Sequence, residues 1–119
     1  MAHKILAVDN EEDILALIFE YLNEDEKYEL FQARDLTEAR AVLQEQQVSL
    51  ILLDVILDRE SGFDFLHELK SSKATHEIPV VVISVIDNPA RSHALGAAGY
   101  LAKPFSAEKL KSKLEELLS

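Results

Sequence analysis

The sequence predicts a single doubly wound α/β domain, in which helices cover both faces of a parallel sheet. Short continuous apolar runs alternate with segments whose apolar residues recur at helical spacing, which is the pattern of repeated βα units. The runs at residues 5–8, 50–53 and 80–83 are unbroken, which is typical of strands buried on both faces. A length of 119 residues leaves room for one core and not for two. We therefore expect five βα units without a linker or a repeat.

The N-terminal half of the chain contains signals for three strands and two helices. Strands are predicted over residues 4–8, 28–33 and 49–53. The first helix is predicted over residues 12–23, with an apolar face made of Ile14, Leu15, Leu17, Ile18, Tyr21 and Leu22. Asp35 and Glu38 have the spacing of a capping box, which predicts the start of a second helix. The inward side chains of that helix are Ala39, Val42 and Leu43.

The C-terminal half contains signals for three helices and two strands. A loop over residues 55–61 leads to a third helix that begins at Gly62, with an inward face made of Phe63, Phe65, Leu66 and Leu69. A short fourth helix begins near Asn88 and Pro89, a cap followed by a first-turn proline, and stops at Gly96. The last helix is capped by Ser106 and buries Leu110, Leu114 and Leu117. The two strands are predicted over residues 80–83 and 100–102.

The composition limits the classes of partner and compartment. A net charge of −10 and a pI near 4.7 would repel nucleic-acid backbones and anionic membranes, so neither is expected as a direct partner. The chain contains no cysteine, which excludes disulfides and thiolate metal sites. No signal peptide or membrane-spanning run is recognised, and we expect a cytoplasmic protein.

Polar or charged residues stand at the ends of four predicted strands. Asp9 and Asn10 follow the first strand, Asp54 the third, Ser84 the fourth and Lys103 the fifth. Ligands of open α/β sheets bind where the carboxyl ends of parallel strands open outward. We therefore expect these side chains to form one site.

The residue types at these strand ends indicate phosphoryl chemistry. Asp9 and Asp54 are hard oxygen ligands of the kind that Mg²⁺ takes in proteins. Burial would penalise the charge of Asp54 by several kcal/mol unless a cation or donors lay nearby, and Lys103 is the obvious protein cation. A carboxylate nucleophile with a metal, an ammonium and the hydroxyl of Ser84 has the parts needed to accept a phosphoryl group.

Six short motifs together resemble the receiver domain of two-component response regulators. They occur in the family's order, and the resemblance covers essentially the whole chain, residues 1–119. It implies a flavodoxin-like five-stranded parallel sheet with strand order 2-1-3-4-5. The motifs are Val8-Asp9-Asn10-Glu11, Leu53-Asp54, Gly62-Phe63, Ile83-Ser84, the segment 96–101 and Lys103-Pro104-Phe105.

The resemblance implies that Asp54 is the phosphorylated residue. Its phosphoryl donor would be the phosphohistidine of a histidine kinase or of a histidine phosphotransfer domain. Asp9, Asn10 and Asp54, together with the backbone carbonyl of Ile56, match the positions that hold Mg²⁺. Such a domain catalyses only its own phosphorylation and dephosphorylation, so it is not expected to be an enzyme in the usual sense.

The resemblance also assigns roles near the C-terminus. Ser84 and Lys103 match the residues that bind the phosphoryl oxygens, and Ser84 and Tyr100 match the switch residues. The Lys103-Pro104 peptide bond is expected to be cis, a geometry that proline tolerates. The output would pass to a downstream protein or to a covalently attached domain.

Several positions depart from the family pattern. Asn10 stands where the family usually has a second acid, which is expected to lower metal affinity, and Glu11 could partly compensate. Val85 replaces a very small residue and is expected to narrow the path to Asp54, and Asp58 replaces a frequent proline. The segment from Ser84 to Lys103 is about one helical turn shorter than in most stand-alone receivers, as in receivers of hybrid sensor kinases.

Three functions therefore remain open from the sequence. The first is a phosphoacceptor domain of a two-component phosphorelay. The second is a receiver-like scaffold that works by protein contact without phosphorylation, which Asn10 and Val85 favour. The third, a flavin-binding electron carrier on a similar sheet, is disfavoured because the three carboxylates of Glu11, Glu12 and Asp13 would repel a phosphate near the first turn.

Overall fold

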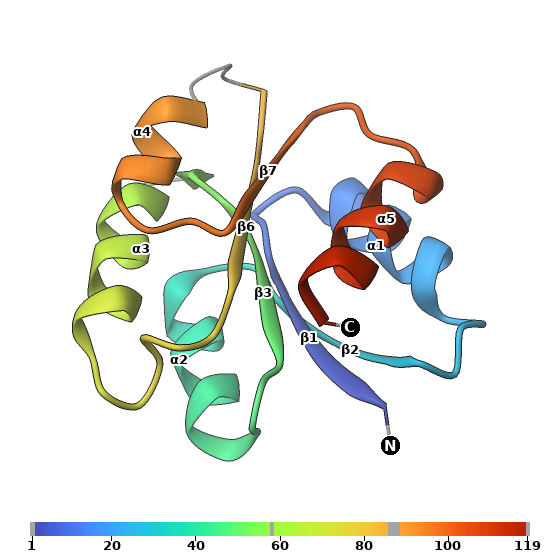
Figure 1. The fold of residues 1–119 in the computed structure, drawn as a ribbon, viewed down its shortest axis with the longest axis horizontal. Helices are drawn as coiled ribbons and strands as arrows, with labels where there is room; N and C mark the ends of the chain where they lie inside the picture. The colour runs from blue at the N-terminus through green and yellow to red at the C-terminus, as the bar shows by residue number, and fades with distance from the viewer. Residues whose placement is uncertain (1, 58, 86–88, 119) are drawn as a thin grey trace.

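The protein folds into a five-stranded parallel sheet that is covered by helices on both faces. The structure is a computed structural model, which describes residues 2–57, 59–85 and 89–118. Helices α1 (Glu12–Leu22) and α5 (Ala107–Leu118) lie on one face of the sheet (Figure 1). Helices α2 (Leu36–Glu45), α3 (Gly62–Ser71) and α4 (Pro89–Ala94) lie on the other. The carboxyl ends of the strands point toward the top of Figure 1.

The strand order is β2-β1-β3-β6-β7, and every neighbouring pair is parallel. When the two short strands β4 and β5 are set aside, this is the expected order 2-1-3-4-5, so the predicted fold class is confirmed. Each predicted strand boundary lies within one residue of the observed one. The observed strands are β1 (His3–Val8), β2 (Tyr28–Ala33), β3 (Leu50–Asp54), β6 (Val80–Ser84) and β7 (Gly99–Ala102).

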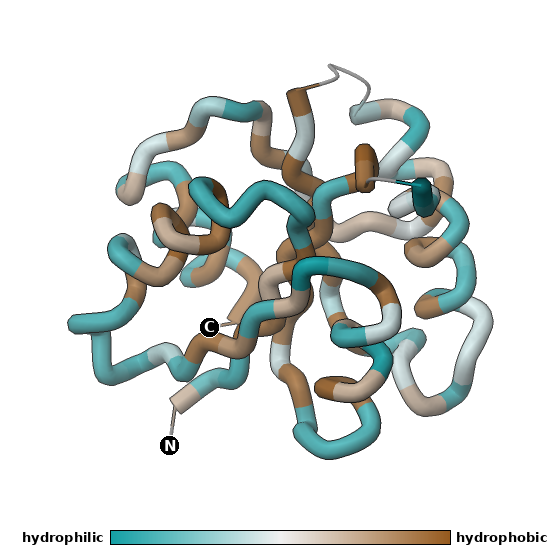
Figure 2. Tube along the Cα trace, turned by 180° about the vertical axis from the view of Figure 1, so that it is seen from behind, coloured by the Kyte–Doolittle hydropathy of each residue, from teal (hydrophilic) through white to brown (hydrophobic). Residues whose placement is uncertain are grey.

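The sheet separates two apolar cores, because successive side chains of a strand point to opposite faces. In β3, Leu50 and Leu52 pack with the residues of α1 and α5, whereas Ile51 and Leu53 pack with those of α2 and α3. All four side chains are at most 1 % exposed, which explains the unbroken aliphatic run. Figure 2 shows the hydrophobic strands at the centre and the hydrophilic segments around them.

Among the residues that the structure describes, side chains cap α2, α3 and α5 (Ala107–Leu118), and two of these caps follow the sequence signals. Asp35 accepts a hydrogen bond from the Glu38 amide (2.8 Å), and Ser106 accepts one from the Lys109 amide (3.1 Å). The Glu38 carboxylate, however, accepts from the amide of Arg34 (2.7 Å) rather than from that of Asp35, so the capping box is displaced by one residue. Ser61 caps α3 through the Asp64 amide.

The fourth helix is short, as predicted. It ends before Gly96, whose φ of 97° is the left-handed conformation common after a helix end. The expected cap Asn88 lies outside the described residues, as do Asp58, Ile86 and Asp87. None of the helices in the described ranges is both long enough and apolar enough to cross a membrane.

The loop expected over residues 55–61 contains a small antiparallel hairpin, so this part of the prediction was wrong in detail. Strands β4 (Ile56–Leu57) and β5 (Glu60–Ser61) pair with each other and not with the main sheet. Arg59 lies in the turn between them with a φ of 62°. A side chain with a Cβ is strained in this left-handed region, where glycine is not.

We predict that Arg59→Gly stabilises the protein by about 0.5 kcal/mol, because relief of the left-handed strain outweighs the added freedom of glycine in the unfolded chain. Urea unfolding of both proteins measures the difference. Arg59→Ala is the matched control, since it removes the same charge and keeps a Cβ. If both variants shift the unfolding midpoint equally, the charge of Arg59 and not its backbone is responsible.

Candidate functional site

The register of the sheet brings the polar strand ends to one edge. Val8 lies beside Leu53 in β1 and β3, so Asp9 and Asp54 follow at the same level. Asp54 lies beside Ile83, and Ser84 lies beside Ala102, the residue before Lys103. The backbone amide of Lys103 donates to the Ser84 carbonyl (2.9 Å) and continues the pairing past the end of β7.

The centre of this edge is an ion triad of Asp9, Asp54 and Lys103. The Lys103 Nζ lies 2.9 Å from Asp9 Oδ2 and 3.0 Å from Asp54 Oδ2. The side chains of both acids are 3 % exposed and that of Lys103 is 6 % exposed, so the pairing is shielded from water. Two buried carboxylates that share one ammonium leave an excess negative charge in the crevice. The site is therefore prepared for a further cation.

Burial and pairing shift the proton affinities of the triad. Desolvation raises the pKa of Asp54, and the nearby charge of Asp9 adds to this, although the Ile56 amide and the Lys103 ammonium oppose it. Burial alone would lower the pKa of Lys103, but its hydrogen bonds to Asp9 and Asp54 outweigh that effect and raise it. Lys103 thus stays protonated at neutral pH. Burial and the charge of Asp9 thus oppose the charged form of Asp54, whereas the Ile56 amide and the Lys103 ammonium favour it.

Backbone groups fix the second oxygen of each acid. Asp9 Oδ1 accepts from the Glu11 amide and Asp54 Oδ1 accepts from the Ile56 amide, both at 2.9 Å. Each carboxylate therefore turns its Oδ2 toward the lysine. Among the described residues, no buried side-chain nitrogen or oxygen lacks a hydrogen-bond partner.

Gly62 is required by a close approach of two backbone segments. A Cβ at this position would lie 2.3 Å from the Val55 Cα and 2.5 Å from the Asp54 carbonyl oxygen. The Gly62 amide also donates to the Val55 carbonyl (3.1 Å). The start of α3 thus holds the segment that carries the Ile56 amide against Asp54.

Ser84 and Tyr100 lie on the opposite side of the sheet edge from the triad. Strand alternation places Leu101 in the core under α1 and α5, whereas Tyr100 packs against the core under α2 and α3. Ser84 has the same parity in β6 as Val80 and Val82, which belong to that second core, and it is fully buried. Both residues that resemble the switch pair therefore lie on the face that carries α4.

The donor set of the triad fits a hard divalent cation. Carboxylate oxygens of Asp9 and Asp54 converge on one cationic group, and Mg²⁺ typically takes one or two carboxylates and keeps several waters. Asn10 is exposed at the mouth of the site. Within the described part of the chain, no three His, Asp or Glu side chains are already drawn together as metal ligands.

Two contacts near the site were not predicted from the sequence. Glu11 Oε2 lies 3.9 Å from Lys103 Nζ. The sequence suggested only that Glu11 could partly compensate for Asn10, and it did not predict this contact with the lysine. The Arg91 guanidinium lies over the Phe63 ring, 4.0 Å from its centroid, and joins α4 to α3.

Two apolar side chains at the rim are also exposed, Ile56 by 43 % and Val85 by 68 %. The Lys103-Pro104 bond is cis, as expected.

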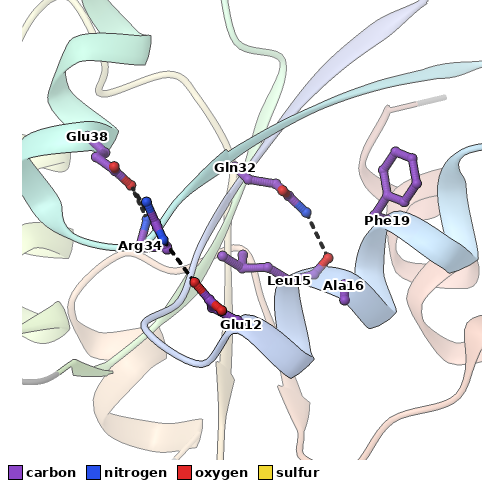
Figure 3. A pocket seen from close by; sticks show the side chains of 7 residues that line it. All are labelled: Glu12, Leu15, Ala16, Phe19, Gln32, Arg34 and Glu38. Atoms are coloured by element: carbon purple, nitrogen blue, oxygen red, sulfur yellow. Dashed lines mark hydrogen bonds and ion pairs between the residues drawn. The ribbon is translucent and has the colours of Figure 1, made fainter.

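A surface groove with a volume near 610 Å³ lies elsewhere, between α1, β2 and α2. Figure 3 shows Arg34 between Glu12 and Glu38, and the Gln32 amide turned toward the Leu15 carbonyl. These groups satisfy one another. The acids and the arginine of this groove are exposed, unlike the buried ion triad at the strand ends, so its size does not make it the functional centre.

Comparisons with known proteins agree with this geometry. The family model described as response regulator receiver domain matches residues 5–115. The sensory transduction protein LytR of Streptococcus agalactiae is 34 % identical over 96 % of this chain and 47 % of its own length. The chain spans about half the length of the curated relatives that it matches first.

Solved structures show the same fold. The chemotaxis protein CheY4 of Vibrio cholerae has a TM-score of 0.91 at 29 % identity, over 99 % of this chain and all of that one. The phosphorylated cyanobacterial phytochrome response regulator RcpA has a TM-score of 0.86 at 30 % identity, over 100 % of this chain and 96 % of that one.

We predict that Gly62→Ala destabilises the protein by about 2 kcal/mol, because the new Cβ forces the backbone at Asp54 and Val55 to move. Urea unfolding measures the loss, and the amide resonance of Ile56 reports the displacement. Gly99→Ala is the matched control, since a Cβ there meets no atom closer than 3.6 Å. An equal loss in both variants would show that glycine replacement as such, and not the close approach, is the cause.

We also predict that Asp54→Asn is more stable than the parent chain at pH 7. The raised pKa means that the folded state holds the Asp54 proton more tightly than the unfolded state does. Its ionisation therefore costs stability as the pH rises from the unfolded value near 3.8 through the raised folded value. The gain of the variant should shrink as the pH falls toward 4, as urea unfolding across pH will measure. Asp64→Asn, on an exposed acid, is the control.

Proposed function

The chain belongs to the response regulator receiver domain family, and we propose that it is a cytoplasmic phosphoacceptor signalling domain phosphorylated on Asp54 in the presence of Mg²⁺. The ion triad is the observation that carries this proposal. A buried carboxylate with one oxygen held by a backbone amide and the other on a lysine ammonium has the geometry of a nucleophile poised for phosphoryl transfer. The donor would be a histidine kinase or a histidine phosphotransfer domain.

The phosphoryl transfer forms a bond between a carboxylate oxygen of Asp54 and phosphorus, while the bond between phosphorus and the donor atom breaks. Lys103 would exchange its contact with Asp54 Oδ2 for the phosphoryl oxygens, and the Ser84 hydroxyl would donate to another of these oxygens. Asp9, Asn10, Asp54 and the Ile56 carbonyl would hold Mg²⁺. When bound, the metal would neutralise charge on the phosphoryl oxygens. The domain catalyses only this self-modification and its reversal.

Phosphorylation would be read on the face that carries α4. The phosphoryl group on Asp54 would add charge beside the end of β6, where Ser84 lies on the same side of the sheet as Tyr100. We infer that this biases an equilibrium between two arrangements of the segment from Ser84 to Tyr100. The reader would be a downstream protein or a covalently attached domain. The lengths of the relatives leave room for either.

The phosphorylation test uses acetyl phosphate with Mg²⁺ and intact mass. We predict one phosphate adduct on the parent chain and none on Asp54→Asn, because the amide is not a nucleophile here. Asp64→Asn, which removes an exposed acid from the start of α3, should keep the adduct. Lys103→Ala should form it far more slowly.

The alternative is a receiver-like scaffold that works without phosphorylation, and Asn10 is the observation that favours it. A parent chain without an adduct after prolonged incubation, also with a phosphorylated histidine donor, would support the scaffold. An adduct that persists in Asp54→Asn would instead place the modification on another residue.

A further inference from the structure

The acid expected after Asp9 is absent from this chain. Asn10 supplies a neutral amide at that position, and its side chain makes no hydrogen bond with any described residue. The crevice therefore has two carboxylates of its own, and the Lys103 ammonium already lies between them. A divalent cation must compete with this ammonium for the same Oδ2 atoms. Additional negative charge at the mouth of the site would shift that competition toward the metal.

Glu11 is placed to supply this charge. Its carboxylate Oε2 lies 3.9 Å from Lys103 Nζ, and its side chain is 57 % exposed. The backbone of Glu11 is fixed beside the site, because its amide donates to Asp9 Oδ1 at 2.9 Å. The backbone of Glu11 is thus bonded to one acid of the triad, while its side-chain carboxylate lies near the ammonium.

Side-chain capping does not explain a glutamate at this position. Glu11 is the N-cap of α1, with extended dihedral angles of φ −90° and ψ 111°, and its side chain makes no capping hydrogen bond. Serine, threonine, aspartate and asparagine are the side chains that cap from this position. Glu11 instead turns its carboxylate away from the amides of the first turn and toward Lys103.

From this geometry we infer that Glu11 is the third carboxylate of the Mg²⁺ site and replaces the charge that Asn10 lacks. This inference rests on the proposed function, since it concerns the same site. Glu11 makes no hydrogen bond through its side chain to a described residue and can turn by rotation of its exposed arm. It would act on the metal directly or through a metal-bound water, which Mg²⁺ readily keeps.

A titration of the full chain with MgCl₂ tests the inference without any phosphoryl transfer. The chain contains no tryptophan, so the amide resonances of Glu11 and Ile56 are the suitable probes. We expect Glu11→Gln to weaken Mg²⁺ binding about tenfold, as for other residues that support a metal site. Asp13→Asn is the matched control, because it removes one charge from the same first turn of α1 and makes no ion pair with Lys103. It should change the affinity little.

A double-mutant cycle with Asn10→Asp separates replacement from a general charge effect. If Glu11 replaces the missing acid, Glu11→Gln should weaken binding by only about twofold once an aspartate stands at position 10. Equal losses in both backgrounds would overturn the inference, since the two positions would then act independently. Unchanged or tighter binding in Glu11→Gln alone would also overturn it, and would leave Glu11 as a partner of Lys103 only.

The outcome for the parent chain keeps the two proposals apart. If the parent binds Mg²⁺ and is phosphorylated but Glu11→Gln behaves like the parent, only the role of Glu11 fails. If the parent does not bind Mg²⁺ at millimolar concentration, the metal in the proposed function fails and the role of Glu11 fails with it.

Discussion

The buried contact of one ammonium with two carboxylates is the constraint around which the rest of this site is built. Removing two carboxylates and an ammonium from water costs several kcal/mol per ion, and their mutual attraction offsets this only with good geometry and further hydrogen bonds. The Lys103 Nζ meets both acids within 3.0 Å, and backbone amides satisfy their remaining oxygens. The register of β1, β3 and β7 and the close approach at Gly62 serve to hold that geometry.

Strand alternation divides the strand-end edge into two functional sides. Asp9, Asp54 and Lys103 share the parity of the core under α1 and α5, whereas Ser84 and Tyr100 share that of the core under α2 and α3. A charge added to Asp54 would therefore act first on the triad, and the end of β6, which pairs with β3 at Asp54, is the nearest part of the second side. Lys103 joins the two sides, because its amide is bonded to the Ser84 carbonyl while its side chain belongs to the triad.

The sequence could predict the site residues that lie at the carboxyl ends of the strands. Asp9, Asp54, Ser84 and Lys103 end buried apolar runs, and parallel strands bring their carboxyl ends together without knowledge of the loops. The hairpin at 56–61 and the left-handed conformation of Arg59 depend on the path of the loop before α3. The spacing of apolar residues in the sequence carries no information about that path. The capping box at Asp35 and Glu38 was displaced because Glu38 reaches the Arg34 amide instead. Resemblance to a family, not spacing, was needed to assign Ile56 and Tyr100.

Lys103 stabilises the site as the structure shows it, and under the proposed function it would change partners when a metal and a phosphoryl group bind. Because its pKa is raised, Lys103 contributes stability that is complete below 10.5, the value in the unfolded chain, and is lost only as the pH rises through the folded value. At neutral pH the ammonium is therefore charged and pairs with the same two carboxylates that the proposed Mg²⁺ would use. An acid at position 10 would add repulsion in the resting state and favour the loaded one. Under the proposed function, Asn10 would lose part of that bias and lower the metal affinity, unless the exposed carboxylate of Glu11 restored the charge.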